Sequence, residues 1–143
     1  MAVTLQSAID EIMADLVAAL TTVRSAPDDP PEQVAAFPFM TVHPGAGAWE
    51  EGPAGMKTGL HSIAVELHVA RSQGLARAVS EALGFAESVP NTIFKGRDAD
   101  QFNHTIDTFD RITYTFGPLS WAGVDTFGWI FKVEGVKQQT VVA

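Results

Sequence analysis

The sequence predicts an α+β domain, with a mainly antiparallel sheet of about four strands and two helices packed on one face of the sheet. Two segments carry apolar residues at helical spacings of three and four, and four other segments alternate apolar and polar residues as half-buried strands do. The 143 residues are 46% hydrophobic, which suits one folded core. We therefore expect a single α+β domain over residues 1–143.

The first predicted element is an amphipathic helix. Pro27, Pro30 and Pro31 cannot continue a helix, so it must end before them. Its apolar stripe recurs at spacings of three and four and consists of Leu5, Ala8, Ile9, Ile12, Leu16, Ala19, Leu20 and Val23.

Two strands with a glycine-rich segment between them follow. A short strand is predicted over residues 37–43, and a more regularly alternating strand over 60–71. The intervening residues 44–59 hold five glycines and two prolines and show no period. We expect an extended Gly-rich loop there, or a hairpin extension, between two antiparallel strands.

A second helix is predicted from residue 72 to about 88. Its apolar side recurs at helical spacing, and Pro90 is expected to end it. A polar connection over 91–104 should then lead back to the sheet.

The last two predicted strands complete the sheet. One covers residues 105–116 and is expected to end at Gly117 and Pro118. The other covers 126–136, with large apolar residues at every second position. Residues 138–143 are expected to form a frayed tail.

Composition excludes several kinds of function. The chain has no cysteine, which excludes disulfides, thiolate metal sites and thiol nucleophiles. A formal net charge of -8, with nine scattered Lys and Arg, disfavours binding to nucleic acid through its phosphates. An acidic surface could still line a passage through which DNA moves. No run of about 18–20 apolar residues is present to span a bilayer, and no signal peptide is expected.

No catalytic residue, metal site or cofactor is predicted. His61 and His68 are seven residues apart on one predicted strand, so they face opposite sides and cannot share an ion. His43 and His68 could meet across the hairpin, but no third ligand is evident. The acidic residues between 98 and 110 lack the spacing of a calcium loop or of paired catalytic carboxylates. We therefore predict that the chain is not an enzyme.

The sequence instead offers candidate partner contacts. A tryptophan in a glycine-rich segment either anchors a partner or covers the domain's own core, and tryptophan is enriched at interface hot spots. The predicted partner-interface residues within 44–59 are Trp49, Glu50, Glu51 and Met56. We add Glu66 and His68, on the face of the strand opposite the core.

The order and texture of these segments resemble the tail terminator (tail completion, minor tail) proteins of long-tailed bacteriophages. The resemblance covers nearly the whole chain, from the opening helix onward, and rests on no single motif. The segments that carry it are FPFMTVHPG, the glycine-rich excursion, GLHSIAVELHVAR, GLARAVSEALGFAESVP and GWIFKVEGV.

This resemblance implies a structural virion protein that forms a homohexameric ring through head-to-tail contacts. The ring would cap the tail tube, stop its polymerisation and join tail to head, with the tail tube protein and neck or connector proteins as partners. DNA would pass through the ring without specific binding. The implied location is the virion tail or neck, and the host cytoplasm during assembly. Segments 44–59 and 91–104 would meet the tube or the neck.

Two other readings stay open. One is a different phage neck component, such as a head-closure or connector protein. The other is a small enzyme or ligand-binding module with an open-faced α+β sheet, which would need a pocket with converging polar groups around His43 and His68.

Overall fold

The computed structural model describes residues 5–20, 38–71, 75–98, 109–121 and 123–141. The predicted fold class is confirmed: two helices accompany one four-stranded antiparallel sheet, with the order β1-β2-β4-β3. The helices are α1 (Leu5–Ala19) and α2 (Leu75–Asp98). The strands are β1 (Phe39–Glu51), β2 (Met56–Arg71), β3 (Arg111–Trp121) and β4 (Val124–Val141), and a short 3-10 turn, η1 (Pro53–Gly55), joins β1 to β2.

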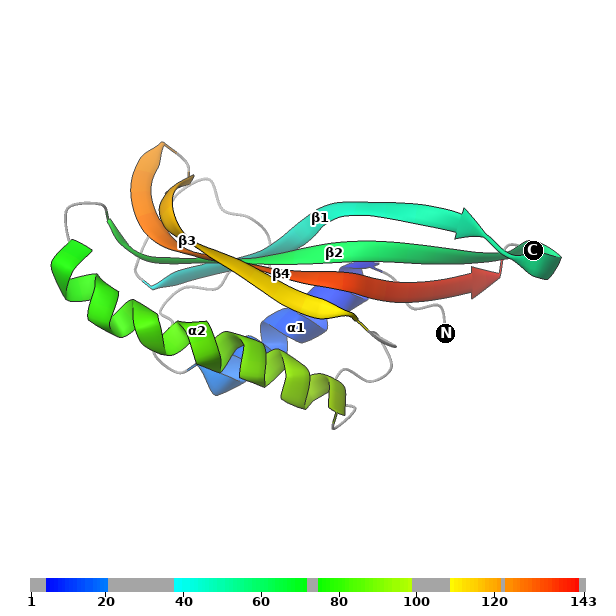
Figure 1. The fold of residues 1–143 in the computed structure, drawn as a ribbon, viewed down its shortest axis with the longest axis horizontal. Coiled ribbons are helices and arrows are strands. Elements are labelled where there is room, and N and C mark those ends of the chain that lie inside the picture. The colour runs from blue at the N-terminus through cyan, green and yellow to red at the C-terminus, as the bar shows by residue number, and fades with distance from the viewer. Residues whose placement is uncertain (1–4, 21–37, 72–74, 99–108, 122, 142–143) are drawn as a thin grey trace.

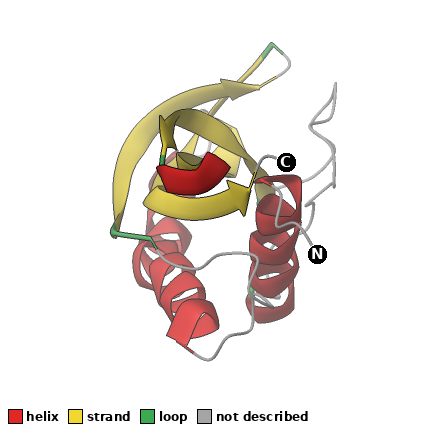
Figure 2. Ribbon diagram, turned by 90° about the vertical axis from the view of Figure 1, so that its right-hand side faces the viewer, coloured by secondary structure: helices red, strands yellow, loops and turns green. Residues whose placement is uncertain are grey.

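Both helices lie on the same face of the sheet (Figure 1), and the end-on view shows them side by side beneath its curved strands (Figure 2). The core fills the space between the two layers. It takes most of the predicted stripe of α1, in which Ala19 is exposed, and the predicted alternate residues of β2, because both patterns place apolar side chains toward the same layer. The fully buried members include Ile12, Leu16, Ile63, Val65, Leu67, Phe131 and Val133.

Trp129 ties α2 to the sheet. Its indole Nε1 donates a hydrogen bond of 2.9 Å to the carbonyl oxygen of Ala82 in α2. The rings of Phe116, Tyr114 and Phe131 surround the indole, with centroids 4.7, 5.4 and 5.7 Å away. A buried indole N–H needs an acceptor, so this bond fixes which turn of α2 lies over β4.

Helix α2 does not end at Pro90, as the sequence analysis expected, but continues to Asp98. Proline inside a helix removes one backbone hydrogen bond and costs about 3 kcal/mol or more. Val89 and Ile93, on either side of it, are buried in the core. Burying such side chains contributes about 1.5–3 kcal/mol each, which offsets the penalty of the proline. Of the polar connection expected after Pro90, residues 99–104 lie outside the described residues.

Most of the glycine-rich segment 44–59 forms strand. Of the two forms expected for it, the structure has the hairpin extension: β1 runs to Glu51, β2 begins at Met56, and Trp49 pairs with Gly59 between them. Only residues 52–55 connect the strands. The sequence of this segment shows no alternation of apolar and polar residues, because its glycines have no side chains. Strand pairing needs only the backbone N–H and C=O groups, so glycines can still form a strand.

The C-terminal strands are longer than predicted. β3 continues through Gly117 and Pro118 to Trp121, because an edge strand can turn the missing N–H of a proline outward. β4 continues to Val141, so most of the tail that was expected to fray is paired with β2. The partner of residues 138–141 is the start of β2, residues 56–59, which lies in the extended β1–β2 hairpin. The predicted continuation of the first helix to Val23 lies outside the described residues, as does the start of the strand predicted over 105–116.

We predict that Trp129→Phe lowers the free energy of unfolding by about 2 kcal/mol, because it removes the hydrogen bond to Ala82 and leaves a smaller ring in the core. Urea unfolding followed by circular dichroism measures the change. The matched control is Trp49→Phe, the same substitution at a half-exposed ring, which should stay within about 0.5 kcal/mol of the parent. Equal losses in both variants would contradict the role given to Trp129.

Candidate functional site

Three strands project past the helices as an arm. We define the arm as residues 47–51 of β1, 56–61 of β2 and 136–141 of β4, which pair side by side. At the right of Figure 1 these strands run on beyond the ends of α1 and α2. In β1, every residue from Pro44 to Glu51 is exposed. The arm therefore offers a surface of paired strands that leaves the two-layer body of the domain.

Trp49 lies on the arm and is 53% exposed. Its ring packs edge-on against the buried His61, with the ring centroids 5.1 Å apart. Gly59, the residue opposite Trp49, makes this possible, because a Cβ there would collide with the His61 ring and press on the Trp49 ring. One side of the indole thus covers the domain's own strand, and the other side faces solvent.

The other predicted contacts of segment 44–59 gather beside Trp49. Glu50 and Glu51 are exposed at the end of β1, and Met56 is half-buried at the start of β2. Lys57 is also exposed and pairs with Glu51 across the hairpin. The end of the arm is therefore an aromatic ring beside two carboxylates and one ammonium group.

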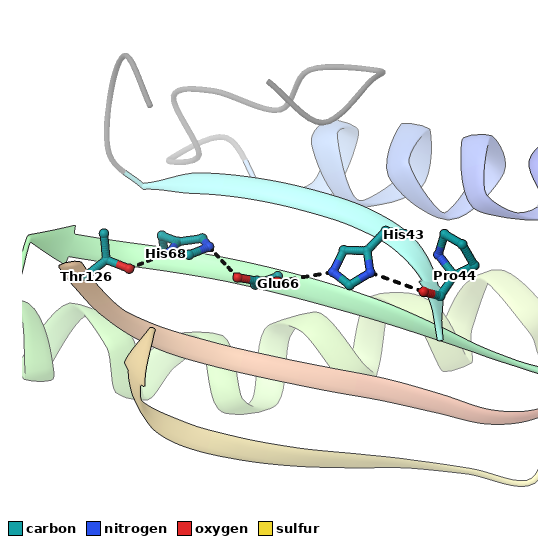
Figure 3. A network of polar contacts seen from close by, with 5 residues as sticks. All are labelled: His43, Pro44, Glu66, His68 and Thr126. Atoms are coloured by element: carbon teal, nitrogen blue, oxygen red, sulfur yellow. Dashed lines mark hydrogen bonds and ion pairs between the residues drawn. The ribbon is translucent and has the colours of Figure 1, made fainter. Parts of the chain in front are cut away.

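A polar network runs along the face of β2 that is turned away from the helices (Figure 3). Glu66 is its centre. Its Oε2 atom lies 3.1 Å from Nε2 of His43, and its Oε1 atom lies 2.7 Å from Nε2 of His68. Nδ1 of His68 lies 2.5 Å from the hydroxyl oxygen of Thr126, and Nδ1 of His43 lies 3.3 Å from the carbonyl oxygen of Pro44. The network links β1, β2 and β4.

Strand pairing brings these side chains together. Thr41 pairs with Glu66 and Phe39 with His68, so alternate residues of β1 and β2, including His43, share this face. His61 shares the opposite face with Ile63, which confirms the prediction that His61 and His68 face opposite sides. His43 and His68 do approach one another, but through the carboxylate of Glu66.

An aromatic cover buries one end of the network. His68 is 0% exposed and Thr126 is 1% exposed. The rings of Phe39 and Trp121 lie 5.5 and 5.9 Å from the His68 ring, measured between centroids. Trp121 comes from the end of β3, where the hairpin with β4 bends up and away from the helices (Figure 1). The sheet therefore has a small second core on the face that the helices do not cover.

The network holds Glu66 as a carboxylate. Burial raises the pKa of Glu66, but hydrogen bonds and charges from His43 and His68 outweigh burial and lower the pKa to about 2. The hydrogen bond to Glu66 raises the pKa of His43, and the Pro44 carbonyl adds to this effect while burial opposes it. An ion pair between Glu66 and His43 is thus favoured in mildly acidic solution.

The order Thr126, His68, Glu66 resembles a nucleophile, base and acid in their spacing. A substrate cannot reach the Thr126 hydroxyl in this fold, however, because both Thr126 and His68 are buried. Glu66 directs one oxygen at each imidazole. Among the residues that the structure describes, no three His, Asp or Glu side chains are grouped to hold a metal ion. The network therefore acts on the fold itself, by joining three strands.

The predicted interface residues separate into two groups. Trp49, Glu50, Glu51 and Met56 lie at the end of the arm, where a partner can reach them. His68 is fully buried and the Glu66 side chain is 12% exposed, so the prediction that this pair meets a partner does not fit their positions. The error arose because the half-buried strand was expected to have one bare face, whereas Trp121 and Phe39 cover part of it.

Sequence reasoning did not assign His43 and Thr126 to one network. For His43 a signal existed, since a hairpin pairs it near Glu66 on the same face. For Thr126 there was none, because the pairing of β2 with β4 joins strands far apart in the chain.

A hollow of about 690 Å³ lies elsewhere, between the end of α1 and the C-terminal half of α2. Asp15 and Lys95 line it, and burial, followed by the charge of Glu11, raises the pKa of Asp15. His43 and His68 do not line this hollow, although the ligand-binding reading expected a pocket around them.

Comparison of the chain with protein-family models finds no match, and comparison with curated proteins finds none either. Within the described ranges, no helix is both long enough and apolar enough to cross a membrane.

We predict that the network stabilises the fold most between about pH 4.5 and 6.5. The raised pKa of His43 contributes stability that is complete below its unfolded value of 6.5 and is lost as the pH rises through the folded value. The lowered pKa of Glu66 contributes stability that is complete above 4.5 and is lost as the pH falls toward 2. Glu66→Gln should therefore destabilise the fold by about 1–2 kcal/mol inside this window, after allowance for solvent screening, and by less outside it.

Unfolding free energies measured from pH 3 to 9 for both proteins test this. Glu50→Gln, at an exposed carboxylate on the arm, is the control and should show no such window. A constant difference between Glu66→Gln and the parent over the whole range would contradict the assignment.

We predict opposite effects for two substitutions of buried threonines. Thr126→Val should cost about 1–3 kcal/mol, because it leaves Nδ1 of His68 buried without its partner. The Thr41 hydroxyl is buried and has no hydrogen-bond partner among the described residues, so Thr41→Val should be neutral or stabilising. Thermal unfolding of both variants at pH 6 measures these changes in stability. If Thr126→Val is as stable as the parent, the network contributes little to the stability of the fold.

Proposed function

We propose that the chain is a structural virion protein, a tail terminator of a long-tailed bacteriophage, which forms a ring that caps the tail tube and joins tail to head. The observation that carries the proposal is the arm. It agrees with the expectation, drawn from the resemblance, that segment 44–59 meets the tube or the neck.

The arm suits a contact with another protein. A strand pair that leaves the body of a domain exposes backbone and side chains together, and Trp49 at its end presents a large ring with little loss of rotamer freedom. Glu50 and Glu51 beside it add charge that can select a partner and orient it. Pairing on three strands keeps these groups in place, so a partner meets a surface that is already ordered.

The rest of the chain supports an assembly role. The formal net charge of -8 suits a ring whose lumen DNA crosses without adhering, since like charges repel. The buried network and the core tether at Trp129 hold β2 and β4, the strands that continue into the arm. The proposed partners are the tail tube protein on one side of the ring and a neck or connector protein on the other. No cofactor or catalytic step is required.

The test mixes the purified chain with the tail tube protein encoded beside it and follows tube growth by electron microscopy. We expect the chain to bind tube ends and to stop their extension. The double variant Glu51→Lys with Met56→Ala should weaken binding at least tenfold, because it reverses a charge and removes an apolar side chain at the end of the arm.

Leu83→Ala is the control, since Leu83 is an exposed apolar residue on α2, away from the arm. It should bind tube ends as the parent does. A parent chain that stays monomeric and leaves tube growth unchanged would refute the proposal, and binding to connector protein alone would favour the reading as another neck component.

A further inference from the structure

The outer strands of the sheet, β1 and β3, each have an open edge, and in the arm β4 is also open on the side away from β2. In the order β1-β2-β4-β3, the outer sides of β1 and β3 have no strand partner among the described residues. Both edges are accessible, since β1 is exposed from Pro44 onward and β3 is exposed or half-exposed along its whole length. Edge strands present unpaired N–H and C=O groups, which are a template for pairing with another chain.

Each edge also carries exposed aromatic rings. Tyr114 and Phe116 on β3 are 56% and 40% exposed, and both pack against Trp129 on the helix side of the sheet. Trp49 on β1 is 53% exposed. Large apolar groups grouped at an accessible edge mark a site of interaction.

We propose that the two edges pair with each other between neighbouring copies of this chain. Residues 47–50 of β1 in one copy pair antiparallel with residues 111–114 of β3 in the next copy. Glu50 then lies opposite Arg111, Trp49 opposite Ile112, Ala48 opposite Thr113 and Gly47 opposite Tyr114. This inference rests on the proposed ring and names the surface that builds it. Trp49 and Glu50 then contact the neighbouring copy, and Glu51 and Met56 at the end of the arm remain for the tube or the neck.

The strand directions permit this contact. β1 is antiparallel to β2, β2 to β4 and β4 to β3, so β1 and β3 of one copy run in opposite directions. A second copy in the same orientation therefore brings its β3 antiparallel to β1. In the proposed register this copy is moved about four residues along the strands, because Thr113 is level with Ala64 and Ala48 with Leu60. The contact is head-to-tail, keeps all helices on one side of the shared sheet, and closes into a ring if each step adds a rotation.

The faces of the two strands agree in this register. Trp49 and Gly47 lie on the side of His61, which is the helix side. Ile112 and Tyr114 lie opposite Val133 and Phe131, also on the helix side. The pairing therefore sets an indole against an isoleucine. A shift of one residue would place each apolar side chain opposite a residue of the wrong face.

Charge and side-chain size select this register from those two residues away. Glu50 is exposed and has no basic residue opposite it in its own chain, where it pairs with Thr58. The Arg111 side chain is 72% exposed, although its Nε atom lies 2.6 Å from Glu134. Only with Glu50 opposite Arg111 do these charges meet directly. The same register places Gly47, which has no side chain, opposite the large ring of Tyr114.

A symmetric pairing of two β1 edges is less favourable. It would bring Glu50 and Glu51 of both copies onto one short ladder, in a chain that already carries a net charge of -8. The β3 edge would also keep its aromatic rings in solvent.

Disulfide cross-linking tests the pairing, and the chain is suited to it because it has no cysteine of its own. The single variants Ala48→Cys and Thr113→Cys are mixed and oxidised, after circular dichroism has shown that each folds like the parent. Within one copy the two positions lie on opposite edges, three strand spacings or about 14 Å apart across the sheet. They are also about 14 Å apart along the strands, because Thr113 is level with Ala64 and Ala48 with Leu60, so no disulfide can bridge them. We expect a disulfide-linked dimer from the mixture and none from either variant alone.

Ala48→Cys mixed with Ser120→Cys is the matched control. Ser120 is exposed on the same edge as Thr113 but lies seven residues, or about 24 Å, further along it. This mixture should give less than a tenth of the dimer formed with Thr113→Cys. Equal yields from the two mixtures, a dimer from Ala48→Cys alone, or no dimer in any mixture would each overturn the proposed pairing.

Binding to the tail tube separates this inference from the proposed function. A chain that cross-links as expected but leaves tube growth unchanged keeps the edge pairing and loses the role as terminator. A chain that caps tubes but does not cross-link keeps that role and must assemble through another surface.

Discussion

The pairing of β2 along its whole length, with β1 on one side and β4 on the other, is the constraint on which the rest of the structure depends. Its sixteen residues pass from the helix-covered body into the arm without a break. In the body, one face of β2 packs against the helices and the other carries Glu66 and His68. In the arm the same strand holds His61 under Trp49. Core, network and arm are therefore three regions of one strand, and an error in its register would disturb all of them.

The buried network opposes such an error. Burying a carboxylate is unfavourable unless it is paired and hydrogen-bonded, and Glu66 meets that condition only where His43 and His68 reach it. If β2 slipped by one residue, Glu66 would turn toward the apolar core and the imidazoles would lose their partner. The correct register is thus favoured twice, by apolar burial on one face and by polar pairing on the other. The same polar network also fixes the position of β4, through the contact between His68 and Thr126.

Much of this fold follows from local patterns, and the differences from expectation have identifiable physical causes. The alternation of β2 and most of the stripe of α1 place their core residues correctly, because the spacing of apolar residues shows which side of each element is buried. In α1 the exceptions are Ala19, which is exposed, and Met13, which is buried without having been predicted. Pro90 misleads because a local helix breaker is overruled by tertiary burial of Val89 and Ile93. The glycines of residues 44–59 hide a strand since they have no side chains to alternate. The network depends on β2 meeting β4, a contact between distant segments that no short window of sequence contains. For the same reason the sequence analysis did not include Thr126 among its candidate residues.

The edge strands β1 and β3 are only partly protected against pairing with other chains. Some of the unprotected residues belong to the arm, so this bears on the role of the arm. Natural sheets blunt their open edges with bulges and prolines. β1 has a bulge between Pro44 and Gly47, and β3 has Pro118. Beyond these devices lie residues 47–51 on one edge and 111–116 on the other, which are regular, accessible strand. On a monomer, both stretches would be free to pair with other chains without control. A head-to-tail contact between neighbouring copies pairs one stretch with the other at every step of a closed ring. The two unprotected stretches carry opposite charges at Glu50 and Arg111. Bulges and prolines are therefore absent where the strand of a neighbouring copy can pair specifically with the edge.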